Sequence, residues 1–388
     1  MARGYSVTIT DDDKFVVFKI KPTYKQTRDA KIAKKKPDDM PKDSLGIYDV
    51  EQNKLEKIAR VKSYKMPEKA GVWLAYLMEK PLPETKDKKE LDSIGKLNEL
   101  SNKAAAMQKQ MDSLNNLIAK AQEQGIHLLT PKKDSTAKQK KEDDIEEGTE
   151  LVLRNLTDGK EQKIKLVQEY LFSKYGNKFV VETTKKNNSK LNSSLILFYL
   201  ERENFTFPQD TLAKAYIDVK NFCFNEVGDL AAFILTNDTT KNEQKKYDLY
   251  FVQRIVQQQI HGEGRTILMQ ADNIENKYLN GVIGEKFVNE NFSLFFSKSN
   301  SDLFFGLSPK LPPKDTTLPE FERVNVDVWN YKDDNLMTAQ LKDLDKELKK
   351  SYLTKYIFED LRIVKLGSPK FEPIRVTQEG DGKYFYAV

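Results

Sequence analysis

The feature of this sequence that most constrains its fold is a phrase that recurs along the chain. In each copy, a few polar residues and a small turn with Gly, Asp or Asn precede an alternating run of β-branched and aromatic residues. Gly, Asn and Asp supply the positive φ that tight hairpins require, and the run has the composition of a strand. The clear copies lie at residues 10–18, 173–181, 225–233 and 378–387, and looser copies lie at residues 69–76 and 289–296.

A second recurring element lies between these copies. It is a short apolar strand, and in the first two cases a polar turn (Gln52 and Asn53, then Asp158 and Gly159) and a further strand follow it. The strands cover residues 45–50, 151–156, 195–200 and 247–252. Two hairpins per repeat make a four-stranded antiparallel unit.

The repetition of four-stranded units predicts a mainly β chain and, in particular, a β-propeller. The units recur every roughly 50 to 60 residues, which is slightly longer than the usual propeller repeat, and loops absorb such a difference. Propellers pack four-stranded sheets with short edges around a central channel. A pair of β-sandwiches uses the same strand lengths and turns, but the fixed order of the two elements favours the propeller.

Between Lys80 and Gly148 the strand pattern stops and a helical pattern replaces it. Apolar residues spaced three and four apart form a heptad seam on a helix that begins near Leu91 and ends near Gly125. The seam consists of Leu97, Leu100, Ala104, Met107, Met111, Leu114, Ile118 and Ala121. Such a helix either packs on its own protein or forms a coiled coil with another chain. In the second case Leu97, Leu100, Met107, Met111, Leu114 and Ile118 mediate self-association.

The pattern divides the chain into three parts. Residues 1–80 carry the first propeller blades, residues 81–148 the helical insertion with a charged linker, and residues 149–388 further blades. The linker, residues 131–147, is rich in Lys, Asp and Glu. We expect it to be disordered, because it cannot bury enough apolar surface to offset the entropy of ordering.

Three smaller features complete the expected organisation. Residues 22–44 are lysine-rich and predict a long loop, residues 324–331 alternate as a strand, and a short helix is expected at about residues 335–353. Strand composition begins at Tyr5, and the chain stops at Val388 inside or just after a strand. This pattern predicts a propeller that is incomplete or truncated.

The composition excludes several classes of protein. Lys and Arg number 64 against 59 Asp and Glu, and the net charge of +5 is too balanced to favour a nucleic-acid partner. No apolar stretch approaches the roughly 18 residues of a membrane helix, and residues 1–10 lack the apolar core of a secretory signal. The one cysteine, Cys223, excludes an internal disulfide and a cysteine-based metal site. Because it lies in an apolar run, we expect a buried thiol.

The residues predict no catalytic, cofactor-binding or metal site. An α/β-hydrolase needs G-x-S-x-G, which this sequence lacks. His127 follows the predicted helix, and His261 lies in a glycine turn without the third glycine of a phosphate-binding loop. The acidic run at residues 11–13 occupies a turn of the repeated phrase and lacks calcium-loop spacing. The acidic pair at residues 333–334 is ordinary at this charge density and does not indicate a glycosidase.

Several segments resemble the N-terminal propeller region of prolyl-oligopeptidase-family serine peptidases of the Bacteroidetes type. The similar pieces are short and spread over nearly the whole chain: FVVFKIKP (15–22), MPKDSLGI (40–47), WLAY (73–76), VDVWNYKD (326–333) and SYL (351–353). In that family a propeller covers a C-terminal α/β-hydrolase domain and limits access to its Ser-Asp-His triad.

The resemblance implies a function and a partner for this chain. It would be the non-catalytic propeller that filters peptides on their way to a hydrolase domain, which this sequence lacks, and no catalytic residue is carried over. It also implies that the full-length protein is exported or periplasmic. The residues leave an alternative open: a stand-alone propeller that binds a protein or peptide, with the heptad helix for docking or dimerisation.

Overall fold

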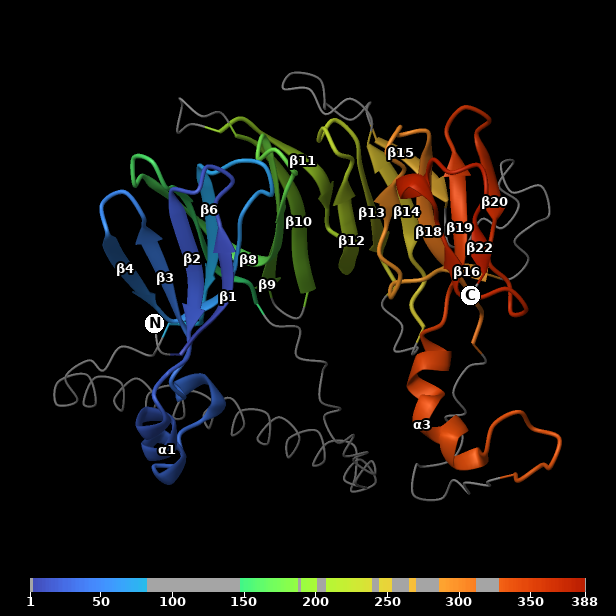
Figure 1. The fold of residues 1–388 in the computed structure, drawn as a ribbon, viewed down its shortest axis with the longest axis horizontal. Coiled ribbons are helices and arrows are strands. Elements are labelled where there is room, and N and C mark those ends of the chain that lie inside the picture. Colours follow the sequence, from blue (N-terminus) through green and yellow to red (C-terminus); the bar gives the residue numbers. More distant parts are fainter. Residues whose placement is uncertain are drawn as a thin grey trace, which may run out of the picture. The chain divides into compact units, whose positions relative to one another are not determined.

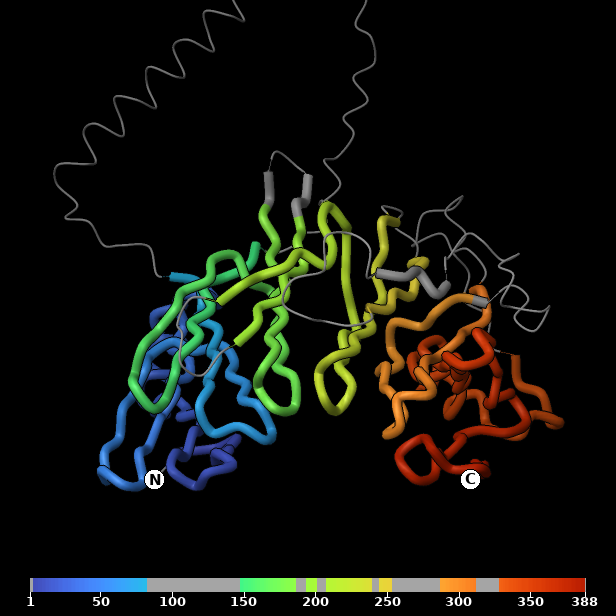
Figure 2. Tube along the Cα trace, turned by 90° about the horizontal axis from the view of Figure 1, so that it is seen from above, coloured from blue at the N-terminus to red at the C-terminus, as the bar shows by residue number. Residues whose placement is uncertain are grey.

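The computed structural model describes residues 3–81, 147–187, 190–200, 207–238, 244–252, 265–269, 286–311 and 328–387. All of these residues except Pro81 belong to one unit that spans residues 1–80 and 147–388. The unit is mainly β, and its antiparallel sheets follow one another in chain order (Figures 1 and 2). The predicted heptad helix lies outside the described residues, and so does the predicted linker up to residue 146.

The first sheet has four strands in the order β1-β2-β3-β4. Their bounds are β1 Gly4–Ile9, β2 Phe15–Ile20, β3 Ser44–Asp49 and β4 Lys54–Ala59. The long loop predicted between β2 and β3 is wrong, because this segment contains α1 (Tyr24–Ile32) and the 3-10 helix η1 (Pro37–Asp39). A capping box starts α1: the Gln26 N–H donates to the Thr23 hydroxyl at 3.2 Å, and the Thr23 N–H donates to the Gln26 side chain at 3.0 Å.

A seven-stranded sheet follows, in the order β11-β10-β9-β8-β7-β6-β5. Its strands are β5 Val61–Lys65, β6 Trp73–Met78, β7 Thr149–Asn155, β8 Glu161–Phe172, β9 Lys178–Asn187, β10 Lys190–Tyr199 and β11 Gln209–Lys214. The long strand β8 pairs with β7 up to Val167 and with β9 from Val167 onward. The register shifts there, and Leu166 has a φ of 64°. The strand therefore bends where it leaves one partner for the other.

Two further sheets and one short hairpin complete the described chain. The third sheet contains β12 Asp218–Phe224, β13 Ala231–Thr236, β14 Asp248–Val252 and β15 Arg265–Met269. The fourth contains β16 Lys286–Val288, β17 Phe295–Phe296, β18 Asp302–Pro309, β19 Tyr352–Ile357 and β20 Arg362–Lys365. In it, β16 and β17 pair with opposite ends of β18 and together act as one split strand. The two-stranded hairpin pairs β21 Ile374–Arg375 with β22 Tyr386–Ala387, and the 3-10 helix η4 Gln378–Gly380 lies between them.

The described strands make five four-stranded blades when the two halves of β8 are counted as separate strands of the seven-stranded sheet and β16 with β17 as one strand. Blade 1 is β1 to β4, blade 2 is β5 to β7 with the first half of β8, and blade 3 is the second half of β8 with β9 to β11. Blade 4 is β12 to β15, and blade 5 is β16 to β20. The sequence interpretation of a mainly β chain built from four-stranded antiparallel units is confirmed.

Apolar clusters lie between all consecutive pairs of these blades. The cluster between blades 1 and 2 contains Val17 and Leu74, and the cluster between blades 2 and 3 contains Trp73 and Phe179. Leu195 and Phe233 belong to the cluster between blades 3 and 4, and Ile234 and Leu303 to the cluster between blades 4 and 5. The inner strands are thus covered on both faces: in β13, Phe233 packs toward blade 3 and Ile234 toward blade 5. Burial on both faces is why β6 and β13 read as continuous apolar runs rather than alternating ones.

The two recurring elements of the sequence occupy fixed places in the blades. The phrases at residues 10–18, 173–181 and 225–233 form hairpins, as predicted, and so does the looser copy at residues 69–76. Each of these hairpins joins the first strand of a blade to its second. The second element forms the third strand of blades 1 to 4, namely β3, β7, β10 and β14.

Four local predictions need correction. Residues 289–296 connect β16 to β17 and form no hairpin between blade strands. Residues 378–387 form η4 and β22, whose partner is β21 rather than a blade strand. The predicted helix at residues 335–353 is α3, Met337–Leu348, and it ends early because Tyr352 and Leu353 pair with β18. The predicted strand at residues 324–331 is absent from its described part, residues 328–331.

A candidate binding cavity lined by the first strands of the blades

The turn between the first and second strands has the same hydrogen-bond geometry in four of the five blades. It begins with a buried, short polar residue, which is Thr10, Ser173, Asn225 or Ser297. The side-chain oxygen of this residue accepts the backbone N–H five positions later, at 3.0 Å in the first two turns and 3.1 Å in the others. Its own N–H donates to the carbonyl of the same partner, at 2.9 to 3.1 Å. The polar groups at the end of each first strand are therefore satisfied in the same way.

The fourth residue of each turn has a left-handed backbone. The φ values are 55° at Asp13, 67° at Gly176, 83° at Gly228 and 63° at Asn300. Gly, Asn and Asp are the residue types that adopt this conformation most easily. The sequence signal for the turn is thus a short polar residue followed three positions later by Gly, Asn or Asp.

The first strands of all five blades meet at one cavity of about 570 Å³. The lining residues on these strands are Ser6 and Thr8 of β1, Tyr64 and Lys65 of β5, Leu171 and Phe172 of β8, Phe222, Cys223 and Phe224 of β12, and Phe295 and Phe296 of β17. Turn residues that follow the strands complete the wall, among them Ser173, Asn225 and Ser297. Equivalent strands of all five blades therefore contribute to one cavity, and four of these strands end in the shared turn.

The wall of this cavity, which we call the axial cavity, is partly aromatic. Phe222, Phe224, Phe295 and Phe296 are half-buried and line it. The rings of Phe222 and Phe224 meet edge to face at a centroid distance of 4.9 Å. Such surfaces accept apolar side chains and leave room for a polar backbone beside them.

Ion pairs between blades lie along the same wall. Lys174 of the blade 3 turn donates to Glu226 of the blade 4 turn at 2.5 Å. The hydrogen bond lowers the pKa of Glu226 and raises the pKa of Lys174. Both side chains are about one third exposed, so solvent screens the pair. Its main effect is to place one charge of each sign beside the aromatic surface.

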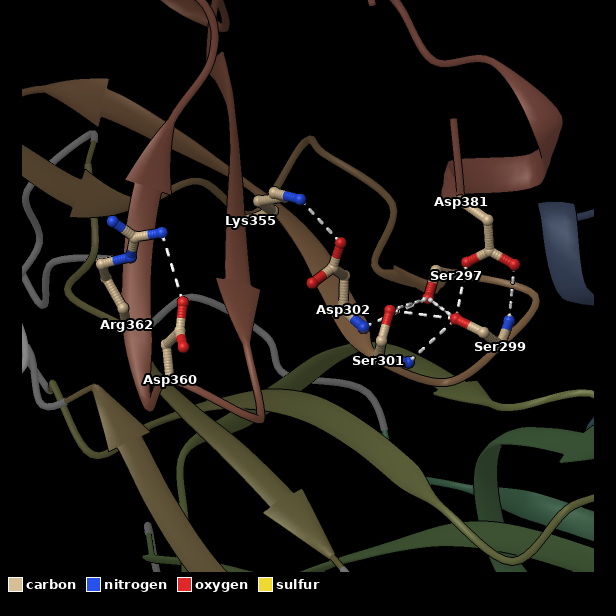
Figure 3. Close-up of polar contacts among 8 residues, drawn as sticks. All are labelled: Ser297, Ser299, Ser301, Asp302, Lys355, Asp360, Arg362 and Asp381. Carbon is tan, nitrogen blue, oxygen red and sulfur yellow. Dashed lines mark hydrogen bonds and ion pairs between the residues drawn. The ribbon is translucent and has the colours of Figure 1, made fainter. Parts of the chain in front are cut away.

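The chain near η4 contributes to the axial cavity from outside the blades. The Lys298 N–H donates to the Glu379 carbonyl at 3.2 Å, and the Ser299 N–H and hydroxyl donate to the Asp381 carboxylate at 2.9 and 2.7 Å (Figure 3). The hydrogen bonds from Ser299 lower the pKa of Asp381. Gly380, at a φ of 97°, fits against the blade 5 turn where a side chain would not. This docking places Glu379 in the cavity wall, 3.4 Å from the Lys298 ammonium.

Cys223 also lines the axial cavity. Its side chain is half-buried and packs against the cluster between blades 4 and 5. Burial raises the pKa of the thiol to about 12. The thiol is therefore protonated near neutral pH and a poor nucleophile.

The acidic residues that the sequence singled out and that the structure describes do not line this cavity. His127 and His261 lie outside the described residues. The acidic run at residues 11–13 forms the blade 1 turn, where Asp12 accepts the Lys14 N–H at 3.3 Å and Asp11 pairs with Lys69 at 3.6 Å. The pair at residues 333–334 is exposed.

No group of three or more His, Cys, Asp or Glu side chains within the described ranges is arranged to hold a metal ion. No helix in the described part of the chain is both long enough and apolar enough to cross a bilayer.

Sequence reasoning missed the axial cavity and the Ser297 turn. The cavity draws two or three residues from each of five distant strands, so no local motif reports it. One signal was available for the turn: Ser297 and Asn300 repeat the spacing of Asn225 and Gly228. It was obscured because β17, the strand before it, has only two residues.

No protein-family model matches the sequence, and no curated protein matches it significantly. Similar solved structures include peptidases, at low sequence identity. The tricorn protease is similar with a TM-score of 0.42 and 9% identity, over 100% of this chain and 29% of that chain. The β-propeller domain of the Trilobed protease from Pyrococcus furiosus has a TM-score of 0.40 and 8% identity, over 97% of this chain and 75% of that domain. Prolyl oligopeptidase B from Galerina marginata has a TM-score of 0.40 and 8% identity, over 96% of this chain and 39% of that chain. This chain thus spans less than half the length of the tricorn and Galerina chains.

Proposed function

We propose that this chain is the non-catalytic propeller region of a peptidase of the prolyl oligopeptidase type, and that its axial cavity selects the peptides that reach a hydrolase domain. The observation that carries the proposal is the convergence of all five first strands on one cavity. The sequence resemblance supplies the class of protein, and the cavity supplies a place where peptides would be selected.

The size and chemistry of the axial cavity suit a short peptide. Its volume of about 570 Å³ lies within the usual range for ligand sites, and a folded protein does not fit in it. Apolar side chains would contact Phe224 and Phe295, while charged ones would meet the Lys174–Glu226 pair. A wall with both kinds of group tolerates varied sequences, which is what a filter requires.

Fluorescence polarisation with a labelled, flexible hexapeptide that contains Phe and Leu tests the binding step. We expect Phe224→Ala to weaken binding about tenfold, because it removes an aromatic contact worth roughly 1 to 2 kcal/mol. Phe371→Ala is the matched control, because Phe371 is 61% exposed and does not line the cavity. Equal affinities for the unchanged chain and Phe224→Ala would refute the proposed site.

The filtering role needs a second experiment, on the protein in the cells from which the sequence comes. An immunoblot with antibody to this chain is combined with labelling by a fluorophosphonate, which reacts with active serine hydrolases. A band well above 44.8 kDa that also labels supports the peptidase role. An unlabelled band at that mass supports instead the stand-alone peptide-binding propeller.

A further inference from the structure

A second cavity, of about 430 Å³, lies where residues of blades 3 and 4 approach each other. Its apolar wall comes from Leu171, Val180, Leu195, Val219 and Phe222. Its charged groups are Lys65 of β5, Glu169 of β8, Glu182 of β9, and Asp218 and Lys220 of β12. We call it the Glu182 cavity. It adjoins the axial cavity, with which it shares Lys65, Leu171 and Phe222.

Both lysines of the Glu182 cavity already have partners. The Lys65 ammonium donates to the Tyr170 carbonyl at 2.8 Å and lies 3.8 Å from the Glu169 carboxylate. The Lys220 ammonium pairs with Glu290 and lies 3.6 Å from Asp218. These contacts direct the two positive charges to acidic groups other than Glu182.

Glu182 differs from the other acidic residues of this cavity. Its side chain is 6% exposed, and no ion pair joins it to any residue that the structure describes. The buried Tyr216 hydroxyl beside Glu182 lowers the pKa of this carboxyl, but it carries no charge that would balance a carboxylate. A buried carboxylate without a compensating charge is costly, so this position is suited to a cation from outside the chain.

We propose that the Glu182 cavity binds an alkylammonium group, with the Glu182 carboxylate as its counter-ion. The apolar side chains of Val180 and Leu195 contact the alkyl part, while Glu182 and the nearby Asp218 face the charge. When Glu182 is ionised, the lining holds three carboxylates and two lysines, and one bound cation brings the local charge to balance. The proposal concerns a different cavity from the axial one and does not rest on the proposed function.

The surroundings favour an ammonium over other ions. A metal ion would need several oxygen or nitrogen ligands, and the described residues hold no such group. An anion would meet an excess of carboxylates, because Lys65 and Lys220 are already paired. An ammonium on an alkyl chain fits both the single buried carboxyl and the apolar wall.

Isothermal titration calorimetry with n-butylammonium tests the proposal, with n-butanol as the neutral probe of equal size. We expect Glu182→Gln to weaken n-butylammonium binding about tenfold or more, since a hydrogen bond to a charged group is worth roughly that factor. Glu150→Gln is the matched control, because Glu150 lies on β7 of the same sheet and outside the cavity. n-Butanol should bind weakly and equally to all three proteins. Equal n-butylammonium affinity for the unchanged chain and Glu182→Gln, or no binding to the unchanged chain, would overturn the proposal.

Proton release on binding gives a second readout that needs no variant. Burial, with Asp218 and Glu169, raises the pKa of Glu182 to about 8, so the empty cavity holds a protonated carboxyl near neutral pH. The titratable groups that face it are Lys65 on β5, Glu169 and Tyr170 on β8, Tyr216 before β12, and Asp218 and Lys220 on β12. n-Butylammonium should displace the proton, and the heat at pH 7 should then vary with the ionisation enthalpy of the buffer. A heat that is the same in all buffers would count against Glu182 as the counter-ion.

Two larger probes distinguish the two possible sources of the ammonium group, a lysine side chain and the amino terminus of a peptide. Nα-acetyl-lysine amide presents a side-chain ammonium, and alanyl-alanine amide presents the amino terminus of a peptide. Tighter binding of either one supports the site and assigns its source. None of these outcomes depends on the hexapeptide assay, because Glu182 does not line the axial cavity.

Discussion

The Lys178 N–H donates to the Ser173 hydroxyl at 3.0 Å, and in the turn that starts blade 3 this is the one backbone N–H that the Ser173 side chain accepts. In blade 4 the equivalent first residue is Asn225, whose side-chain oxygen accepts the N–H groups of Gly228, Asp229 and Leu230 at 2.9, 3.0 and 3.1 Å. The two turns have the same shape but different numbers of bonds to the first side chain. This difference allows the turn to be tested by matched substitutions.

We expect Asn225→Ala to destabilise the fold more than Ser173→Ala does. Ser173→Ala leaves the Lys178 N–H without its side-chain acceptor and should lower the free energy of unfolding by about 1 kcal/mol. Asn225→Ala removes the side-chain acceptor of three N–H groups, of which only Gly228 keeps another acceptor, the Asn225 carbonyl at 3.2 Å, and should cost about 2 to 3 kcal/mol. Urea denaturation followed by circular dichroism measures both. Thr338→Ala, at an exposed position of α3, should leave the midpoint nearly unchanged. Equal losses at Ser173 and Asn225 would contradict the hydrogen-bond argument.

Two glycines with left-handed backbones should differ in their tolerance of a methyl group. Gly159 and Gly176 have φ values of 71° and 67°, so alanine strains the backbone at both, by about 1 to 2 kcal/mol. A Cβ at Gly159 would meet nothing within 4 Å, while a Cβ at Gly176 would lie 2.7 Å from Pro67 Cγ. Gly176→Ala should therefore cost about 1 to 3 kcal/mol more than Gly159→Ala. Thermal denaturation of the two variants side by side decides this, and equal melting points would show that Pro67 gives way.

Phe233 should be among the costliest positions in the core. Its ring is fully buried and stacks between Tyr250 and Phe222, at centroid distances of 5.3 and 5.7 Å. Phe233→Ala should lower the free energy of unfolding by about 3 to 5 kcal/mol. Phe371→Ala removes the same group from a 61% exposed site and should cost under about 0.5 kcal/mol. Denaturation of both variants in guanidinium chloride measures these changes. A small loss of unfolding free energy in Phe233→Ala would mean that blades 3 and 4 are not packed as described.

Glu182→Gln should change how stability depends on pH. The pKa of Glu182 is about 8 in the fold and near 4.5 in the unfolded chain, so folding takes up a proton between these values. Wild-type stability therefore falls as pH rises from 4.5 to 8, by up to about 1.4 kcal/mol per pH unit. The Glu182→Gln variant does not lose stability in this way. The difference between its free energy of unfolding and that of the wild type should therefore be greatest at pH 8 and vanish toward pH 4.5. Urea midpoints at pH 5, 6.5 and 8 measure it, with Glu150→Gln as control, and parallel profiles would argue against a protonated Glu182.

Asp381→Ala should release the chain that follows η4 from blade 5. The variant loses both bonds from Ser299 to the carboxylate. It keeps the backbone bond and the exposed ion pair between Lys298 and Glu379, and the edge contact of Phe385 with Phe304. Trypsin should then cut after Lys383 several times faster, as mass spectrometry of timed digests would show. Asp360→Ala, which removes an exposed ion pair with Arg362 in the same blade, should leave the cleavage rate unchanged. Similar rates in both variants would place the anchoring elsewhere.

The strand repeat could be predicted from sequence because its signals are local. The turn residues and the alternating strand after them lie within about nine positions, and the third strand of a blade is an uninterrupted apolar run. The capping box of α1 is equally local, but the segment around Thr23 and Gln26 is rich in lysine, and for this reason a loop was predicted there. The bend at Leu166 gave no signal, because leucine seldom adopts a positive φ. The sequence therefore concealed that β8 serves two blades.

Neither cavity could be predicted, since each draws its lining from several distant strands. Glu182 reads in the sequence as one of many acidic residues in a polar strand. Only the approach of β12 to the second half of β8 buries it and separates it from the lysines nearby.

The shared strand β8 has a consequence for how the protein unfolds. Blades 2 and 3 hold opposite halves of one continuous strand, so neither can lose its hydrogen bonds without disturbing the other. Blade 3 and blade 4, by contrast, belong to separate sheets and meet through side chains. Native-state hydrogen exchange should accordingly show the amides of β5 to β11 opening together as a single cooperative foldon, with those of β12 to β14 opening at a different free energy.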